Sequence, residues 1–567
     1  MKIFLAQQNY HIGNIEANTQ KIIEAITAAK QANGDIILFS ELAVCGYPPR
    51  DFLYFNDFID KCYAAIDKIK LYADGIAVVV GAPQRNAQRE GKDLFNAAYF
   101  LADKEIKQVI HKTCLPTYDV FDEDRYFEPA TAWDVVEYKG RKIAVTICED
   151  IWNLGDNPLY TNCPMDHLIQ QGPDLMLNMS ASPFDYTHDE DRHTAIKANV
   201  TKYKIPLFYV NAVGSQTEIV FDGGSLAFDK HANLCGRLAS FKEDMQSFFL
   251  QDDGTIAGEI LQQSTHVPDR ELKPDTVTEQ LNISSIYEAL ILGIRDYFKK
   301  MGFKKAILGS SGGIDSAVVL ALACDALGAD NVKAVLMPSQ YSTGHSVADA
   351  EQLSINLKND YNIIPIKDIY ESFLTELKPL FKDLPFSVAE ENIQSRTRGN
   401  LLMAIANKFG YILLNTSNKS ELATGYGTLY GDMAGGIGVL GDCYKLQIYE
   451  LAKYINERSR NLSAGRQIIP QNIITKPPSA ELRPGQKDSD SLPDYSILDK
   501  ILYQYIELQK DPQQIKDMGF DAALVDRILK MVNVNEYKRN QFCPIIRVSP
   551  KAFGVGRRMP IVGKYLS

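Results

Sequence analysis

Residues 307–316 read ILGSSGGIDS, and this stretch decides the fold that we expect for the second half of the chain. An apolar strand ends in a turn of small residues, and Asp315 and Ser316 then begin a predicted helix. Small residues let backbone N–H groups approach an anion closely, and a helix N-terminus favours negative charge. The turn therefore indicates a phosphate cradle, with an ordinary strand-to-helix turn as the alternative. It lacks the Gly-Lys-Ser/Thr ending of a P-loop NTPase.

The segments around this turn predict a parallel, doubly wound sheet. Three more apolar strands are expected at 332–339, 361–368 and 411–418, with helical stretches between them. Ligands bind at the carboxyl ends of such strands, and residues 309–316 and 416–421 both fall there. Two segments rich in Gly, Pro and Asp, 431–445 and 475–495, are predicted to be functional loops.

The first half alternates apolar strands with helical stretches, which indicates a second α/β layered domain. Helices are expected at 17–32, 57–72 and 188–203. Strands are expected at 2–8, 35–42, 75–83, 96–103, 142–150, 174–182, 206–214 and 224–229. We predict a first domain at 1–245, a linker at 246–283 and a second domain at 284–567.

Composition narrows the class of protein. The 567 residues are too many for one hydrophobic core, and the 45% hydrophobic and 23% charged content is ordinary for a globular protein. A formal net charge of −11 argues against a general nucleic-acid or membrane-surface binder. No apolar run suggests a membrane span or a secretory signal. The nine cysteines are scattered without a CxxC pair, so we expect reduced thiols and a cytoplasmic location.

The string SGGIDS at 311–316 resembles the pyrophosphate loop of the N-type ATP pyrophosphatases, which cut ATP between its α and β phosphates. Within that group, the segment 415–452 (NTSNKSELATGYGTLYGDMAGGIGVLGDCYKLQIYELA) resembles the NAD synthetase family. The segments 391–403, 476–495 and 535–542 are also similar to that family. Four motifs in order, over about 305–540, make the resemblance specific.

The resemblance implies site residues and cofactors for this half. Asp315 and Glu421 would bind Mg²⁺, because carboxylate and phosphate oxygens are its usual ligands. Lys445 is a helper that neutralises phosphate charge, and Asp432 one that positions ammonia or substrate. The residues expected to bind ATP are Gly309, Ser310, Ser311, Gly312, Gly313, Ile314, Asp315, Ser316 and Thr416. The residues expected to contact deamido-NAD are Asn392, Glu421, Tyr426, Gly427, Thr428, Leu429 and Lys538.

Three residues of the first half suggest a source of ammonia. Glu41 and Cys148 lie at predicted strand ends, and Lys112 lies in HKTCLPTYDVFDEDRYF. A cysteine nucleophile needs a base and a stabilised thiolate. Glu41 would accept the thiol proton, while Lys112 and the backbone N–H of Glu149 would stabilise the oxyanion. The alternative is a buried core cysteine, the usual fate of a free thiol.

Glu, Lys and Cys in this order resemble the nitrilase superfamily of amidases over about residues 2–245. The resemblance implies an α-β-β-α sandwich, a Cys148 thioester, and Glu123 as support for the lysine. Tyr118, Ser182 and His188 would contact glutamine. Relatives often carry Gly and then Lys or Arg where this chain has Thr187 and His188, so Arg192 is an alternative carrier of the positive charge.

The two halves together resemble the glutamine-dependent NAD synthetases. The implied reaction converts deamido-NAD⁺, ATP, glutamine and water into NAD⁺, AMP, diphosphate and glutamate through an acyl-adenylate. The resemblance also implies a homo-oligomer, and we expect a shielded path for ammonia. The alternatives are an ammonia-only NAD synthetase, another glutamine-dependent amidotransferase of the same loop family, and a nucleotide-binding regulatory protein.

Overall fold

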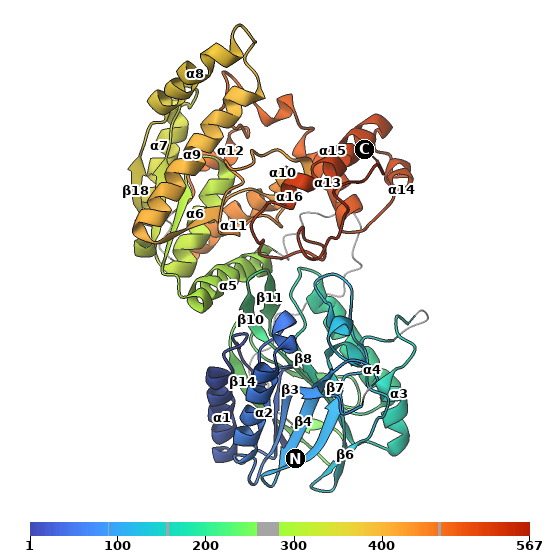
Figure 1. The fold of residues 1–567 in the computed structure, drawn as a ribbon. Coiled ribbons are helices and arrows are strands. Elements are labelled where there is room, and N and C mark those ends of the chain that lie inside the picture. Colours follow the sequence, from blue (N-terminus) through green and yellow to red (C-terminus); the bar gives the residue numbers. More distant parts are fainter. Residues whose placement is uncertain (89, 155–157, 258–282, 463–466, 567) are drawn as a thin grey trace. The chain divides into compact units, whose positions relative to one another are not determined.

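The computed structural model describes residues 1–88, 90–154, 158–257, 283–462 and 467–566. The chain divides into two compact units, Met1–Arg270 and Glu271–Ser567 (Figure 1). Each unit has its own sheets and its own buried core, as expected for a chain of this length.

The first unit contains two large sheets and a hairpin. The seven-stranded sheet has the order β15-β14-β1-β2-β3-β4-β5, and the six-stranded sheet has the order β13-β12-β9-β8-β7-β6. Strands β10 and β11 form the hairpin. The strands are β1 (Lys2–Gln7), β2 (Ile36–Phe39), β3 (Ala77–Arg85), β4 (Leu94–Ala102), β5 (Glu105–His111), β6 (Val136–Tyr138), β7 (Arg141–Ile147), β8 (Leu175–Ser180), β9 (Leu207–Asn211), β10 (Val213–Gln216), β11 (Ile219–Asp222), β12 (Leu226–Phe228), β13 (Leu234–Arg237), β14 (Asp244–Leu250) and β15 (Ile256–Ala257).

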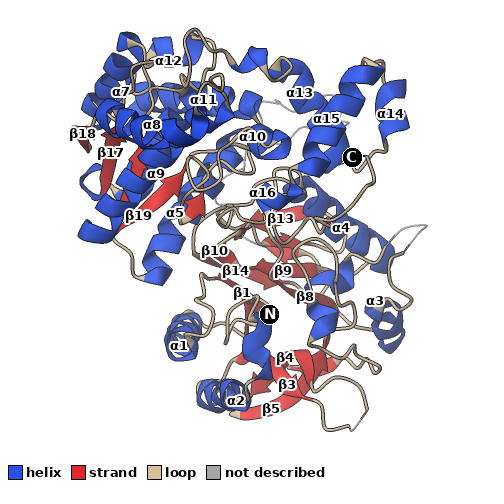
Figure 2. Cartoon of the chain, turned by 45° about the horizontal axis from the view of Figure 1, so that its top comes forward, coloured by secondary structure: helices blue, strands red, loops and turns tan. Residues whose placement is uncertain are grey.

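Helices cover the outer face of each sheet. They are α1 (Ile15–Gln31), α2 (Asn56–Lys70), α3 (Pro164–Leu168) and α4 (His188–Tyr203), with short 3₁₀ turns η1 (Arg50–Tyr54), η2 (Glu123–Arg125), η3 (Cys148–Ile151) and η4 (Ile169–Gln171). Successive side chains of a strand point to opposite faces. Ile3 and Leu5 of β1 therefore pack between the sheets against Val145 and Leu177, whereas Phe4 packs with the α1 and α2 side. Figure 2 shows these helices on either side of the strands, which confirms the α-β-β-α sandwich.

The first unit extends beyond its predicted end at 245. Strand β14 pairs antiparallel with β1 from Lys2↔Phe249 to Gln7↔Asp244, and β15 pairs with β14. The start of the predicted linker is therefore an edge of the first sheet, because alternating apolar residues there complete the intersheet core. The rest of the predicted linker, 258–282, lies outside the described residues.

The second unit is built on one five-stranded sheet of order β18-β17-β16-β19-β20, and every neighbouring pair is parallel. Its strands are β16 (Lys305–Gly309), β17 (Val332–Leu336), β18 (Asp360–Ile363), β19 (Tyr411–Asn415) and β20 (Ile437–Gly438). The chain proceeds from β16 to one edge and then returns to the other side of β16. The order therefore reverses between β16 and β19, where a parallel sheet opens a crevice for ligands.

Helices flank this sheet and continue to the C-terminus. They are α5 (Ile283–Met301), α6 (Ile314–Leu327), α7 (Gly344–Leu357), α8 (Lys367–Phe381), α9 (Val388–Phe409), α10 (Lys419–Thr424), α11 (Lys445–Leu462), α12 (Gln471–Thr475), α13 (Tyr495–Ile506), α14 (Pro512–Asp517), α15 (Ala522–Val534) and α16 (Glu536–Arg539), with 3₁₀ turns η5 (Ala329–Asn331) and η6 (Asp488–Asp490). Leu402 and Ala406 of α9 pack on Ile307 and Val335 of the sheet. Among the described helices, none is long and apolar enough to cross a membrane.

Candidate functional site

The three residues predicted as the ammonia-generating centre lie at strand ends of the first unit. Glu41 follows β2 by two positions, Lys112 directly follows β5, and Cys148 directly follows β7. All three side chains are buried. Cys148 has a φ of 45°, a left-handed conformation that is costly for a residue with a side chain. The turn at Cys148 is therefore held by its surroundings, as at many reactive nucleophiles.

Lys112 lies between two carboxylates. Its Nζ donates to Glu41 Oε1 at 2.7 Å and to both oxygens of Glu123, at 2.7 and 2.9 Å. Burial alone would lower the pKa of Lys112, but Glu123 and Glu41 hold it well above its ordinary value. Burial raises the pKa of Glu123 to about 7, although Lys112 opposes this. The pKa shift therefore favours the charged ammonium of Lys112, which Glu41 and Glu123 hold in place.

Burial, followed by the charge of Glu41, raises the pKa of the Cys148 thiol well above its ordinary value, and Lys112 only partly opposes these effects. The resting cysteine therefore keeps its proton at neutral pH. A reaction at this sulfur needs a base that removes the proton as the substrate arrives, and Glu41 is the carboxylate with the strongest influence on the thiol.

Sequence reasoning missed the residues that hold this centre in place. Asn96 Nδ2 donates to Glu41 Oε1 at 2.7 Å and to Glu123 Oε2 at 3.2 Å, and Tyr47 OH donates to Glu123 Oε1 at 2.7 Å. Asp150 accepts the Thr113 and Ile147 backbone N–H groups at 3.0 and 2.9 Å, so it ties the Lys112 segment to the Cys148 turn. The only sequence signal for Asp150 was its place in the Cys-Glu-Asp string.

The residues predicted to contact glutamine are linked to Glu149 and Trp152, which lie in or directly after the 3₁₀ turn η3 that begins at Cys148. Tyr118 OH donates to Glu149 Oε1 at 2.9 Å, and Ser182 Oγ lies 2.7 Å from His188 Nε2. His188 also stacks on Trp152, with ring centroids 5.0 Å apart. Glu149, whose pKa is raised by burial, was assigned only a backbone role from the sequence.

Arg192, the alternative carrier of the positive charge, is paired inside the protein. Its guanidinium is fully buried and forms a two-pronged ion pair with Asp222, at 2.8 and 3.0 Å. A third bond from Arg192 reaches Gly223 O at 3.2 Å. These contacts give Arg192 a structural partner, and its role toward a substrate stays a prediction.

The second unit has a cavity of about 940 Å³ at the switch point of its sheet. The ATP, dinucleotide and metal residues predicted for this half all line it, except Gly312. The lining members of the set are Gly309, Ser310, Ser311, Gly313, Ile314, Asp315, Ser316, Asn392, Thr416, Glu421, Tyr426, Gly427, Thr428, Leu429 and Lys538, with the helpers Asp432 and Lys445. The loop 476–483 also lines the cavity, as predicted for the Pro-rich segment.

The turn between β16 and α6 depends on Gly312. Its φ is 79°, and a Cβ there would lie 2.1 Å from Ser346 O. The turn is closed from within, because Ser311 Oγ accepts the Gly313 N–H at 3.1 Å and Ser316 Oγ donates to Gly313 O at 3.1 Å. Gly312 thus lets the turn pack on α7 while its neighbours face the cavity.

Two carboxylates meet beside this turn. Lys445 Nζ lies 2.6 Å from Asp315 Oδ2 and 3.4 Å from Glu421 Oε1. Burial, with Asp315 nearby, raises the pKa of Glu421 to about 8. Burial alone would lower the pKa of Lys445, but Asp315 and Glu421 raise it above its ordinary value. Ionisation of Glu421 beside Asp315 therefore costs free energy unless further positive charge is present.

A divalent ion fits this pair. Mg²⁺ takes one or two carboxylates together with phosphate oxygens and water rather than a full protein cage. The described residues contain no cluster of three or more His, Cys, Asp or Glu side chains arranged to hold a metal. A cation between Asp315 and Glu421 would offset the repulsion between these two carboxylates, which is one of the effects that raise the pKa of Glu421.

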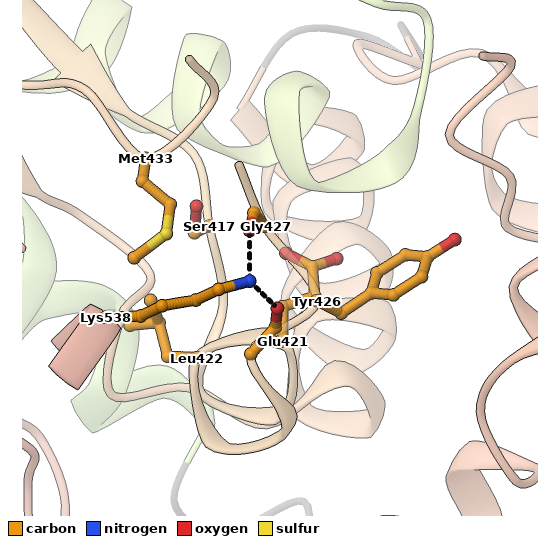
Figure 3. Close-up of a pocket in the computed structure, with 8 residues that line it drawn as sticks. Ser417, Glu421, Leu422, Tyr426, Gly427, Met433 and Lys538 are labelled. Atoms are coloured by element: carbon orange, nitrogen blue, oxygen red, sulfur yellow. Dashed lines mark hydrogen bonds between the residues drawn. The ribbon is translucent and has the colours of Figure 1, made fainter. Parts of the chain in front are cut away.

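The turn 425–432 is braced by the residues predicted to bind the dinucleotide. Lys538 Nζ donates to Gly425 O at 2.8 Å and to Gly427 O at 2.9 Å (Figure 3). Asp432 Oδ1 accepts the Thr428 N–H at 2.6 Å, and Thr428 Oγ1 donates to Asn392 Oδ1 at 2.7 Å. Asp432 and Lys538 are thus part of the cavity wall, whereas the sequence left open that they are solvated surface residues.

Two family models divide the chain between them. The model described as carbon-nitrogen hydrolase matches residues 2–257, and the model described as NAD synthase matches residues 286–542. The first range contains the Glu41, Lys112 and Cys148 centre, and the second contains the cavity of the second unit.

Relatives match over nearly the whole chain. The glutamine-dependent NAD(+) synthetase of Synechocystis sp. is 45% identical over 99% of this chain and 98% of its own length. The protein of the same name from Thermotoga maritima is 39% identical, covering 100% and 99%. A solved glutamine-dependent NAD+ synthetase from Acinetobacter baumannii, in complex with ADP, is 37% identical with a TM-score of 0.75, covering 99% and 98%. A Cytophaga hutchinsonii structure, 19% identical with a TM-score of 0.80 and covering 99% and 98%, supports the fold alone.

Proposed function

The chain belongs to the glutamine-dependent NAD(+) synthetase family, and on that premise we propose which side chains carry each step of its reaction. The enzyme is an ATP-using ligase with a glutaminase domain. Deamido-NAD⁺ receives its amide nitrogen from glutamine, while ATP is cleaved to AMP and diphosphate.

In the first unit, Glu41 removes the proton from Cys148, and the thiolate attacks the carboxamide carbon of glutamine. Lys112 and the backbone N–H of Glu149 stabilise the oxyanion of the tetrahedral intermediate. Glu41 then returns the proton to the leaving nitrogen, so ammonia departs and a Cys148 thioester remains. Water activated by the same carboxylate hydrolyses the thioester to glutamate. This assignment is supported by the burial of the three groups together and by the fixed charge of Lys112.

We assign glutamine recognition to Tyr118, Ser182 and His188. The bond between Ser182 and His188 and the stacking of His188 on Trp152 fix the position of the imidazole. His188 takes the place at which relatives often carry a cation, so it would contact glutamine as a hydrogen-bonding group.

In the second unit, the turn 309–316 and Thr416 hold ATP with its pyrophosphate against the N-terminus of α6. The nicotinate carboxylate of deamido-NAD attacks the α phosphorus, and ammonia then displaces AMP from the acyl-adenylate. Lys445 balances the charge that grows on the departing pyrophosphate. Asn392, the turn 426–429 and Lys538 hold the dinucleotide.

We propose that Asp315 and Glu421 hold Mg²⁺. When bound, the ion neutralises phosphate charge and orients the α phosphorus for attack. The chain contributes two carboxylates, and the ammonium of Lys445 lies against both of them.

Two further properties complete the proposal. We infer a homo-oligomer from the family resemblance, to be checked by light scattering of the full chain. We also infer a cytoplasmic enzyme, since all nine cysteines, which lie in the described residues, are free thiols.

The observation that carries the proposal is the presence of both complete sets on one chain: Glu41, Lys112 and Cys148 in one unit, and the predicted nucleotide residues around one cavity in the other. The test compares NAD⁺ formation by wild type and Cys148→Ala, each given ATP, Mg²⁺, deamido-NAD⁺ and either glutamine or ammonium. We expect Cys148→Ala to lose only the glutamine-driven reaction. If both nitrogen sources fail equally in the variant, Cys148 is not specific to ammonia release. If wild type fails with both, the synthetase assignment itself is wrong.

A further inference from the structure

We propose that Asn418 is a positioning residue that orients Asp315 and Glu421 toward one shared cation. Neither the sequence motifs nor the comparisons assigned Asn418 a role. The inference rests on the proposed metal role of the two carboxylates, and it names the side chain that makes them act as a pair.

The contacts of Asn418 reach both carboxylate residues. Its Nδ2 donates to Asp315 Oδ1 at 2.8 Å. Its Oδ1 accepts the Glu421 backbone N–H at 2.9 Å, and its own backbone N–H donates to Glu421 Oε2 at 3.2 Å. Asn418 is completely buried, so water does not compete for these bonds.

These bonds connect the two sides of the switch point. Asp315 lies in the first turn of α6, after β16, whereas Asn418 follows β19 and caps the N-terminus of α10. Glu421 is held at the third position of α10 by the reciprocal capping bonds. One residue therefore bonds two carboxylates that come from different strand ends, Asp315 through its side chain and Glu421 through its backbone N–H.

The chemistry of the position explains why it is asparagine. The side chain must accept one hydrogen bond from the helix and donate another to a carboxylate, and asparagine offers both from one short amide. Aspartate would cap the helix but present a negative oxygen to Asp315. Serine would also cap the helix, but it is shorter and lacks the amide donor.

The donor to Asp315 also decides which oxygen of Asp315 pairs with Lys445. With Oδ1 bound by Asn418, Oδ2 accepts from Lys445 at 2.6 Å. Without the amide, the Asp315 carboxylate loses the bond that fixes its rotation relative to Glu421. The loss should weaken binding of the cation, while the turn 425–432 stays braced by Lys538.

The test separates the cap from the carboxylate contact. Asn418→Ser keeps an acceptor for the Glu421 N–H but removes the donor to Asp315, and Asn418→Ala removes both. Asn14→Ser is the matched control, because Asn14 caps α1 of the other unit through the Ala17 N–H and has no assigned ligand contact. The measurement is ATP affinity by titration calorimetry of the full chain, in EDTA and in saturating Mg²⁺, together with the melting temperature of each variant.

In EDTA, we expect Asn418→Ser to bind ATP with the affinity of wild type. In saturating Mg²⁺, we expect its ATP affinity to be about tenfold lower than that of wild type, which is the value of one charge-assisted hydrogen bond. Asn418→Ala should show the same loss and also melt a few degrees lower, since it lacks the cap. Asn14→Ser should keep the full Mg²⁺ gain.

Two results would overturn the proposal. One is an unchanged Mg²⁺ gain in Asn418→Ser, and the other is an equal loss of affinity in EDTA, which would indicate a general structural role. Failure of the proposed function is distinguished by a separate assay, because wild type would then make no NAD⁺ whatever the result of the ATP titrations.

Discussion

At the scale of single residues, the glutaminase centre is organised around one buried ammonium. Lys112 donates to the carboxyl groups of both Glu41 and Glu123, so one buried ammonium serves two acidic side chains. Asn96 and Tyr47 donate hydrogen bonds to the same carboxyl groups, and these bonds offset part of the free energy lost when the groups are buried. Buried charges are tolerated when their remaining lone pairs are satisfied in this way. Such a centre keeps its geometry while protons move through it.

Glu123 gives this centre a predicted pH dependence. Its pKa is raised from 4.5 to about 7, mainly by burial, so the folded enzyme holds a proton there more tightly than the unfolded chain. This group therefore costs folding free energy as pH rises from about 4.5 toward 7, and it takes up a proton as pH falls through about 7. A protonated Glu123 no longer balances Lys112. We expect kcat/KM for glutamine hydrolysis to fall below about pH 7.

The Tyr47→Phe variant tests whether Glu123 causes this fall of kcat/KM at low pH, which is the acid limb of the pH profile. Tyr47 OH donates to Glu123 and lowers its pKa, so its removal should move the limb upward by roughly 0.7 pH unit, the equivalent of one ordinary hydrogen bond. Tyr126→Phe is the control, since Tyr126 OH donates to Asp51 instead. A limb that stays in place in Tyr47→Phe would mean that another group titrates.

The sequence could indicate residues of this kind only when their chemistry stands out in a motif. Glu41, Lys112 and Cys148 are a recognisable set in chain order, and they do lie together. Asn96 and Asn418 are ordinary polar residues, and their importance comes from neighbours 55 and 103 positions away in the chain. No local pattern reports such a pairing.

At the scale of elements, the turn between β16 and α6 requires glycine for two separate reasons. Gly312 has a positive φ, and any Cβ would meet the backbone of Ser346 rather than a movable side chain. Gly312→Ala should therefore push the turn away from α7 and weaken ATP binding at least tenfold, with a loss of stability of about 1–3 kcal/mol. Calorimetric ATP titration and urea unfolding are the measurements.

Gly344→Ala is the matched substitution on the facing helix. A Cβ at Gly344 would meet nothing within 4 Å, so this variant should bind ATP and unfold as wild type does. Equal behaviour of the two variants would show that the strain at Gly312 does not matter for the turn.

The elements themselves could largely be predicted, because long amphipathic helices and apolar strands have strong periodic patterns. Helix α4 begins and ends at the predicted residues, 188 and 203, and α1 and α2 differ by only one or two residues at each end. Strand β5 was not predicted, since its side chains are partly exposed and Lys107 and Gln108 interrupt the pattern. Strand β14 was assigned to the linker because its partner β1 lies at the other end of the domain sequence, and only that pairing makes it a strand.

At the scale of the whole molecule, the chain joins a unit that releases ammonia to a unit that consumes it. Each unit has its own buried core and contains the residues that we propose for its step. Ammonia released into neutral water is mostly protonated, and ammonium is not a nucleophile. A chain that carries both activities gains from the fusion only if the nitrogen reaches the adenylate before it equilibrates with solvent, as the expected shielded path requires.

An isotope competition tests that requirement. Wild-type enzyme would receive unlabelled glutamine, ATP, Mg²⁺ and deamido-NAD⁺ in a solution of ¹⁵N-ammonium, and the label in the NAD⁺ amide would be read by mass spectrometry. We expect the product to carry mostly glutamine nitrogen, well above the share that free mixing would give. Cys148→Ala supplies the control, since all of its product nitrogen must come from labelled ammonium. A wild-type product with the label content of the bulk solution would mean that ammonia escapes before use, and the shielded path would then be wrong even though both activities remain.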